Sequence, residues 1–283
     1  MRRRRFASPW TILVLLPLAC ARAPRPVHVD AVEVPAVIRG AVAAPDRPDA
    51  DRLLDVGRHP AETLAFFGIG PGMRVAEIGA GGGYTTELLA RIVGPTGVVY
   101  GQNSPFVLAR FAEKPWTARL AEPGMHDVVR VDRPFDDPLP PEARDLDAVV
   151  IILFYHDTVW QKVDRARMNG AILAALKPGG VYGIVDHGAR PGTGVADAQT
   201  FHRIDEAVVR DEIVAAGFEL VAEASFLRNP ADTRDWNDSP SSAGARRGTS
   251  DRFVLKFVKP ARRRAHSARS AVMGSRLAAR RAG

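Results

Sequence analysis

The sequence predicts an α/β protein with a doubly wound, mostly parallel seven-stranded sheet whose last strand is antiparallel. Three observations support this fold class. From residue 60 onward, short runs rich in Val and Ile alternate with longer segments that have a helical pattern. The runs are largely apolar, as expected for strands that helices cover on both faces. A glycine-rich segment joins the first run to the first long helical segment.

The predicted elements follow one another in a regular order. A short amphipathic helix begins at Pro60 and ends at Gly68, since Pro is favoured at the first helical position and Gly at the end. Six strands follow, separated by segments long enough for crossover helices, at residues 74–78, 98–101, 128–131, 148–153, 181–186 and 218–225. The last strand, 253–258, comes after a polar loop without helical period, so we expect it to return antiparallel.

The composition is that of an ordinary globular chain of 283 residues, 46% hydrophobic and 25% charged. It excludes bulk disorder, collagen and a polytopic membrane protein. The formal net charge is +7, but residues 1–25 and 260–283 hold 13 of the 39 Lys and Arg and no acid, which leaves 26 against 32 Asp and Glu. Because the middle of the chain is at −6, we expect no specific nucleic-acid partner.

Residues 1–23 have the layout of a signal peptide. Four arginines precede an apolar run at 10–18, and small residues surround Cys20. Residues 16–20, Leu-Pro-Leu-Ala-Cys, resemble the lipobox of bacterial lipoproteins, and residues 3–6, Arg-Arg-Arg-Phe, resemble a twin-arginine export signal. We therefore predict an exported protein, periplasmic or tethered to the membrane through lipidation of Cys20. The alternative is a cytoplasmic protein with a disordered N-terminal tail.

The rest of the chain divides into three parts. Residues 24–45 are rich in Pro, Ala and Val without a clear period, which predicts a disordered tether. Residues 46–260 form the predicted α/β domain, and residues 261–283 form an Arg-rich tail that we expect to be disordered. The single cysteine excludes an intrachain disulfide and a cysteine-built zinc site, and we expect no metal.

The motif with the clearest chemistry follows the first strand. Glu77, Gly79, Gly81 and Gly83 give the pattern E-x-G-x-G-x-G. It differs from the dinucleotide fingerprint G-x-G-x-x-G, because Tyr84 stands at the third glycine position. Glycines here let a ligand lie against bare backbone at a helix N-terminus, so we predict a ligand-binding loop. A purely structural tight turn is the alternative.

At these residues the sequence resembles the class I S-adenosylmethionine-dependent methyltransferases, and among them a group of bacterial predicted methyltransferases. The resemblance covers roughly residues 47–260 and includes the glycine loop, Leu-Lys-Pro-Gly-Gly at 176–180, Ala-Gly-Phe at 216–218 and Asp-Arg-Phe-Val-Leu-Lys-Phe at 251–257. It implies the Rossmann-like methyltransferase fold, S-adenosyl-L-methionine as cofactor, and methyl transfer to an unidentified acceptor, which we expect to be a small molecule.

The resemblance also implies a set of cofactor-binding residues. Gly79, Gly81 and Gly83 would line the methionine part, together with Ala80 and Tyr84, and Glu77 would support the loop or the ammonium group. The family usually has an acid after the second strand for the ribose hydroxyls, where this chain has Gln102 and Asn103. Neutral amides predict binding weaker by about 1 kcal/mol. Asp132 is either the partner of the adenine amine or a solvated loop acid.

The candidate catalytic residues follow the fourth and fifth strands, because ligands of such sheets bind beyond the carboxyl ends of the strands. They are Tyr155, His156, Asp157, Asp186 and His187. His156 is a candidate general base that Asp157 or Asp186 would orient. In the alternative interpretation, Tyr155 packs in the core and Asp157 caps a helix. For residues 202–205, His-Arg-Ile-Asp, we favour a charged helix face over a contact with substrate.

Export and this cofactor are in conflict, because S-adenosylmethionine is made in the cytoplasm. An exported methyltransferase would need to fold around its cofactor before export. The alternative function is therefore an exported, catalytically inactive ligand-binding protein that keeps the methyltransferase fold. The sequence gives no indication of the oligomeric state.

Overall fold

The computed structural model describes residues 25–261. The predicted leader, residues 1–23 with Cys20, lies outside the described residues, as does all but the first residue of the predicted tail, 261–283. The predictions on export, lipidation and the tail therefore stay predictions.

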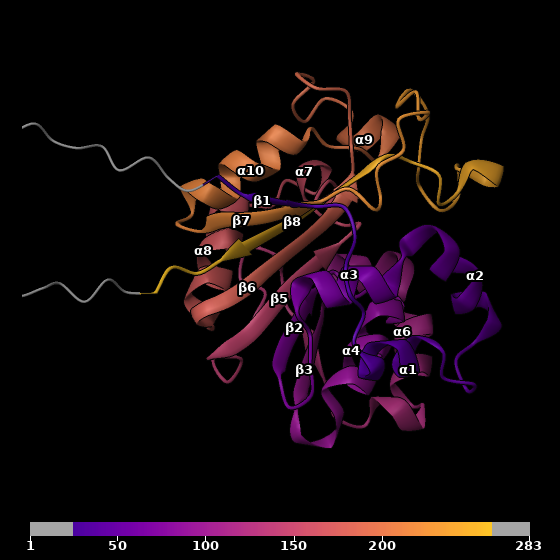
Figure 1. Cartoon of the computed structure of the whole chain (residues 1–283), viewed down its shortest axis with the longest axis vertical. Coiled ribbons are helices and arrows are strands. Elements are labelled where there is room, and N and C mark those ends of the chain that lie inside the picture. Colours follow the sequence, from indigo (N-terminus) through magenta and orange to yellow (C-terminus); the bar gives the residue numbers. More distant parts are fainter. Residues whose placement is uncertain (1–24, 262–283) are drawn as a thin grey trace, which may run out of the picture.

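The fold is built on one mixed sheet of eight strands in the order β1-β7-β8-β6-β5-β2-β3-β4 (Figure 1). All neighbours pair in parallel except β8, which is antiparallel to both β6 and β7. The strands are β1 (Val27–Val29), β2 (Arg74–Ile78), β3 (Val98–Asn103), β4 (Val128–Asp132), β5 (Leu146–Ile152), β6 (Leu176–His187), β7 (Glu219–Ala224) and β8 (Arg252–Val258). The predicted fold class and the antiparallel last strand are confirmed.

An eighth strand was not predicted, and it lies in the segment expected to be a tether. Within residues 24–45, β1 pairs in parallel with β7, and α1 (Ala36–Val42) buries Ile38 completely. The prediction of a disordered tether is therefore wrong for the described part of this segment. The reason is tertiary: β7 has one free edge that a three-residue strand can extend, and so short a strand leaves no periodic signal in the sequence.

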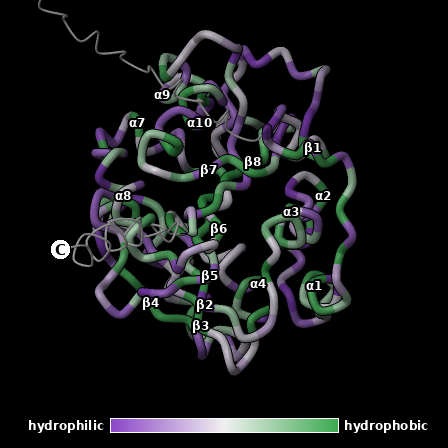
Figure 2. The backbone as a smooth tube through the Cα atoms, turned by 60° about the vertical axis from the view of Figure 1, so that its left-hand side comes forward, coloured by the Kyte–Doolittle hydropathy of each residue, from purple (hydrophilic) through white to green (hydrophobic). Residues whose placement is uncertain are grey.

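Helices cover both faces of the sheet, as the apolar strands predicted. Alternate residues of a strand point to opposite faces, so that Val75 and Val150 pack with α1, α3 and α4, while Ala76 and Val149 belong to the cluster under α6, α8 and α10. The central strands are accordingly the hydrophobic segments of the chain (Figure 2). The helices are α2 (Asp49–Arg58), α3 (Pro60–Phe67), α4 (Tyr84–Val93), α5 (Pro105–Val107), α6 (Glu113–Leu120), α7 (Asp157–Trp160), α8 (Arg165–Ala175), α9 (Ala198–Phe201) and α10 (Glu206–Ala215).

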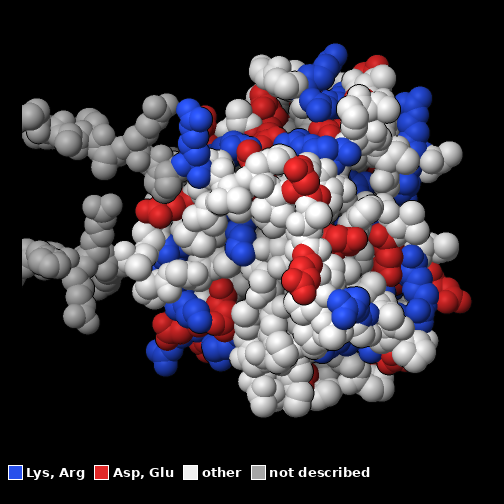
Figure 3. Space-filling view, viewed as in Figure 1, with Lys and Arg blue, Asp and Glu red and all other residues white. Residues whose placement is uncertain are grey.

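The surface gives little sign of a single-sign electrostatic field. On the face shown in Figure 3, positive and negative side chains are interspersed. None of the described helices has the length and apolarity needed to cross a bilayer.

The topology brings four connections to one edge of the sheet. β2, β3, β5 and β6 run in parallel, so the segments that follow them all begin at the carboxyl edge. These segments contain the glycine loop, Ser104, residues 153–157 and the end of β6. Candidate cofactor and catalytic residues therefore share one edge, as expected for a sheet of this kind.

Candidate functional site

The glycine loop between β2 and α4 has the conformation that its sequence predicts. Gly79, Gly81 and Gly83 all have positive φ values, 76°, 56° and 87°. A Cβ atom at Gly79 would meet the ring of Phe154 at 2.6 Å, and one at Gly83 would meet Trp116 at 2.7 Å. At Gly81 nothing lies within 4 Å. Two of the glycines are therefore needed for packing, and the third faces open space that a ligand can use.

Gln102 and Asn103, at the end of β3, form hydrogen bonds with the glycine loop. Asn103 Oδ1 accepts from the amide of Gly81 at 2.8 Å, and its Nδ2 donates to the Gly81 carbonyl at 3.0 Å. Gln102 Oε1 accepts from the amide of Gly79 at 3.1 Å, and the backbone carbonyl of Gln102 accepts from Ala80 at 2.8 Å. Both side chains are fully buried. Their amide groups thus bind the loop itself, a role that the sequence did not indicate.

Glu77 lies beneath the loop on β2 and is almost fully buried. Thr86 of α4 donates a hydrogen bond to its carboxylate. Burial raises the pKa of Glu77 to about 7, although the hydrogen bonds from Thr86 and Thr85 and the charge of Arg58 oppose this shift. Glu77 is therefore partly ionised near neutral pH. A cation bound against the loop would lower its pKa and complete the ionisation.

Arg58 lies beside the glycine loop and is not among the site residues predicted from the sequence. Its guanidinium lies over the ring of Tyr84, 4.3 Å from the centroid, and burial lowers its pKa. Among residues 25–261 it has no carboxylate within 4.0 Å. With Pro60, Tyr84, Thr85 and Ile152 it lines a small hollow beside the loop. A cation without a partner in such a hollow is suited to bind an anion. Only the tertiary structure places it there.

Tyr84, at the start of α4, is held firmly in this arrangement. Its hydroxyl donates to Asp55 at 2.5 Å, and Asp55 also binds Arg47 at 2.7 Å. Burial is the main cause that raises the pKa of Tyr84. The ring is thus a neutral wall of the hollow.

Asp132 lies at the end of β4 and forms an ion pair with Arg130. Both of its carboxylate oxygens accept from Arg130 at 2.9 Å, and Arg130 also binds Glu113 of α6 at 2.8 Å. The carboxylate is two-fifths exposed. The structure thus places Asp132 in a surface ion-pair group, which agrees with the loop-acid interpretation.

Tyr155 lies in the core, not at the mouth of a site. It is fully buried, its hydroxyl donates to Glu212 of α10 at 2.8 Å, and it accepts from Asn169 of α8 at 2.9 Å. The catalytic role predicted for Tyr155 is therefore wrong, and the alternative that Tyr155 packs is correct. The physical reason is that the side chain leaves the end of β5 towards the α8–α10 face, where two polar partners satisfy its hydroxyl.

His156 forms a buried polar cluster with Asp186 of β6. The ring Nδ1 lies 2.7 Å from Asp186 Oδ1, and the backbone amide of His156 donates to Asp186 Oδ2 at 2.8 Å. Burial alone would lower the pKa of His156, but the charges of Asp186 and Asp157 outweigh it and raise the pKa to about 9. The predicted orienting role of Asp186 therefore has a geometric basis. At neutral pH, however, His156 holds a proton, which does not suit a general base.

Residues 202–205 complete this cluster and do not form the charged helix face that we expected. His202 ends α9 with φ at 53°, and its Nδ1 lies 3.2 Å from His156 Nε2 and 3.4 Å from Asp157 Oδ1. Arg203 is fully buried and binds Asp232 at 2.7 Å, and Asp205 caps α10. The expected charged helix face is wrong because these residues connect α9 to α10, and the long loop between β7 and β8 binds Arg203.

His187 belongs to a second, adjoining group. Its Nδ1 lies 2.5 Å from Asp238 and 2.8 Å from Ser250 Oγ, both from the β7–β8 loop, and its ring meets that of His156 with centroids 5.6 Å apart. Burial is the main cause that lowers the pKa of His187 to about 4. His187 is therefore a neutral, enclosed residue, and no local sequence pattern indicates that Asp238 and Ser250 reach it.

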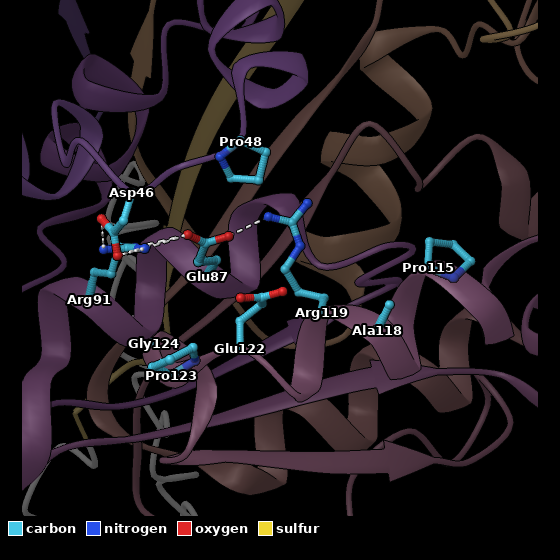
Figure 4. Close-up of a pocket in the computed structure, with 10 residues that line it drawn as sticks. All are labelled: Asp46, Pro48, Glu87, Arg91, Pro115, Ala118, Arg119, Glu122, Pro123 and Gly124. Carbon is cyan, nitrogen blue, oxygen red and sulfur yellow. Dashed lines mark hydrogen bonds and ion pairs between the residues drawn. The ribbon is translucent and has the colours of Figure 1, made fainter.

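A larger cavity lies away from these residues, between α4, α6 and the chain before α2. It measures about 600 Å³. Figure 4 shows Glu87 between Arg91 and Arg119, with Asp46 on the far side of Arg91. Arg91 binds Asp46 at 2.9 Å and Glu87 at 2.8 Å, and Arg119 also binds Glu87. Arg91 and Arg119 therefore neutralise Asp46 and Glu87 in the wall of this cavity.

The strand order, the antiparallel β8 and the glycine loop at the carboxyl edge define the class I methyltransferase fold. Residues 57–117, which contain the glycine loop and β3, match the family model described as protein-L-isoaspartate(D-aspartate) O-methyltransferase. Of the eight strands, this match covers β2 and β3. No curated protein matches the chain.

Solved structures agree on the fold. One is a SAM-dependent methyltransferase from Aquifex aeolicus, 15% identical, with 75% of this chain and 97% of that chain covered and a TM-score of 0.51. Another is a chain in the complex between the Haloferax volcanii Trm112 methyltransferase activator and the putative methyltransferase. It is 20% identical, the match covers 82% of this chain and 100% of that chain, and the TM-score is 0.50. A third is a putative sarcosine dimethylglycine methyltransferase from Galdieria sulphuraria. It is 16% identical, the match covers 81% of this chain and 92% of that chain, and the TM-score is 0.50.

Proposed function

We propose that this protein is an S-adenosyl-L-methionine-dependent methyltransferase whose cofactor binds across the glycine loop. The observation that carries the proposal is Gly81: its φ of 56° and the open space at its Cβ position leave bare backbone facing outward at the N-terminus of α4. Such backbone suits a close-lying ligand. The methyltransferase fold supports S-adenosyl-L-methionine as this ligand.

The chain's own groups fit the amino-acid end of this cofactor. Arg58, which has no carboxylate partner among the described residues, offers its guanidinium for a carboxylate, and the partly ionised Glu77 lies beneath the loop where it favours positive charge. Gln102 and Asn103 hold the loop in shape instead of binding ribose directly. When bound, the cofactor supplies a sulfonium-activated methyl group. The protein then has mainly to align an acceptor with it and exclude water.

The acceptor would approach from the end of β5. Phe154 lies against Gly79 on one side and against Phe135 on the other, with ring centroids 4.9 Å apart, and the chain continues directly to His156. An aromatic wall next to a polar cluster suits a small molecule with one apolar part and one polar group. We propose a small-molecule acceptor on this basis.

Calorimetric titration of the full chain with S-adenosylmethionine and S-adenosylhomocysteine tests the proposal. We expect both to bind, and Gly81→Ala to weaken binding about tenfold or more, because the added methyl group occupies the ligand's side of the loop. Gly179→Ala is the matched control, since Gly179 also has positive φ and nothing within 4 Å but lies near the start of β6, at the opposite edge of the sheet. A folded wild-type protein that binds neither compound would refute the proposal and favour the inactive ligand-binding protein.

The location of the protein is a separate proposal. We keep export through the leader as our expectation, with the periplasm or the membrane surface as destination. Cell fractionation followed by mass spectrometry of the N-terminus tests it. A cytosolic product that retains Met1 would contradict export.

A further inference from the structure

Three side chains from two separate parts of the chain converge on one point. His156 Nε2, Asp157 Oδ1 and His202 Nδ1 form a triangle with edges of 3.2, 3.3 and 3.4 Å. All three atoms are common metal ligands. His202 comes from α9, almost fifty residues further along the chain than the other two, which is why no spacing motif revealed the group.

The size of the triangle matches a tetrahedral metal ion. For bonds of about 2.0–2.1 Å, typical of zinc to histidine nitrogen or carboxylate oxygen, two ligands of a tetrahedron are about 3.3 Å apart. An octahedral ion with similar bonds, such as Mg²⁺, needs about 2.9 Å. The observed edges fit the tetrahedral arrangement. Two imidazoles and one carboxylate also favour zinc over Mg²⁺ or Ca²⁺, which take oxygen ligands.

The surroundings of His156 are those of a metal ligand. Asp186 Oδ1 lies 2.7 Å from Nδ1, so that the Nδ1 proton points to Asp186 and Nε2 points into the triangle, where a metal ion would displace the Nε2 proton. A carboxylate behind a histidine in this way orients the ring and strengthens the metal bond. Asp186 is itself fixed by the backbone amides of His156 and His187, each at 2.8 Å.

The other two ligands are also held in place, yet they leave one side open. Trp160 Nε1 donates to Asp157 Oδ1 at 2.7 Å, and His202 takes a left-handed backbone conformation that only a few per cent of residues other than Gly adopt. The side chains of His202 and Asp157 keep 24% and 17% of their surface exposed. A metal ion bound here would have three protein ligands and a fourth position accessible to water, as in zinc sites that take part in catalysis.

We propose that His156, Asp157 and His202 bind one zinc ion, with Asp186 positioning His156. The proposal goes beyond the proposed methyltransferase activity and replaces our expectation that the chain has no metal site. It does not depend on the cofactor, so the two can fail separately.

Cobalt titration of the full chain, produced without a histidine tag and stripped of metal, tests the proposal without S-adenosylmethionine. Four-coordinate Co²⁺ absorbs visible light intensely and six-coordinate Co²⁺ only weakly. We expect one equivalent to give the intense spectrum and Zn²⁺ to abolish it. His202→Ala and Asp157→Asn should lose the spectrum, and Asp186→Asn should weaken binding about 10- to 100-fold.

His126→Ala is the matched control, because His126 also precedes an aspartate, with 3.0 Å between the two side chains, but is largely exposed. It should bind Co²⁺ as the wild type does. Asp157→Asn keeps the shape of the side chain and serves if His202→Ala does not fold. A weak six-coordinate spectrum in the wild type, or an intense spectrum that persists in folded Asp157→Asn or His202→Ala, would overturn the proposal and leave a hydrogen-bonded histidine pair.

Discussion

Asn103 and Gly81 exchange two hydrogen bonds, one in each direction, at 2.8 and 3.0 Å. The Asn103 side chain is therefore part of the loop's own support. An aspartate could accept from the Gly81 amide but could not donate to its carbonyl. The amide at this position is thus a structural requirement of this loop.

The first prediction concerns Asn103→Asp. We expect it to lower the free energy of unfolding by about 1–3 kcal/mol at neutral pH, because a fully buried carboxylate replaces a paired amide. Urea denaturation measures this. Asn237→Asp, in the more exposed β7–β8 loop, should change stability by less than about 0.5 kcal/mol. A stable Asn103→Asp protein that binds S-adenosylmethionine more tightly would mean that residue 103 contacts the ribose.

The second prediction is a pH dependence that Glu77 causes. Burial raises its pKa from 4.5 to about 7, so its contribution to stability is fully present below about pH 4.5 and is lost as the pH rises through 7. The loss amounts to roughly 3 kcal/mol. Glu77→Gln does not titrate and should be more stable than the wild type at about pH 8 but equal to it at about pH 4.

Urea denaturation of both proteins across this range checks the Glu77 prediction. Parallel stability curves for wild type and Glu77→Gln would contradict the raised pKa. Glu113→Gln is the control, since Glu113 is an exposed acid whose pKa is lowered by the hydrogen bond from Arg130. Its removal should not stabilise the protein at high pH.

The third prediction separates binding from stability at Arg58. Arg58→Met should leave the free energy of unfolding unchanged or slightly raised, because the guanidinium loses no carboxylate partner within residues 25–261. The same variant should weaken S-adenosylmethionine binding about tenfold or more, which corresponds to one charge-assisted contact. Calorimetry and urea denaturation measure the two effects.

Arg47→Met is the comparison for Arg58, since Arg47 lies on the same ring of Tyr84 but binds Asp55. It should lower the free energy of unfolding by about 1–3 kcal/mol. If Arg58→Met loses as much stability and keeps its affinity, Arg58 is a structural residue.

The fourth prediction concerns Tyr155→Phe. Removal of the hydroxyl leaves Glu212 and Asn169 each with one contact fewer, and we expect a loss of about 1 kcal/mol in the free energy of unfolding. Affinity for the cofactor should not change, because the ring stays in the core. If Tyr155→Phe has a changed affinity for the cofactor at unchanged stability, Tyr155 belongs to the cofactor site.

The sequence by itself determined the architecture and the loop. Strands β2 to β8 were predictable because short runs rich in Val and Ile are local signals, and the antiparallel β8 followed from a connection that lacks helical period. The glycine loop was predictable since only glycine takes three left-handed positions in five residues.

Only the tertiary structure decided which polar side chains meet. Asn103 turns to Gly81, Arg58 comes to Tyr84 from the end of α2, and His202 joins His156 from α9. Tyr155 and His156 are neighbours in the turn before α7, yet one enters the core and the other the polar cluster. Contacts of this kind depend on how separate elements pack, and a single sequence carries no local pattern for them.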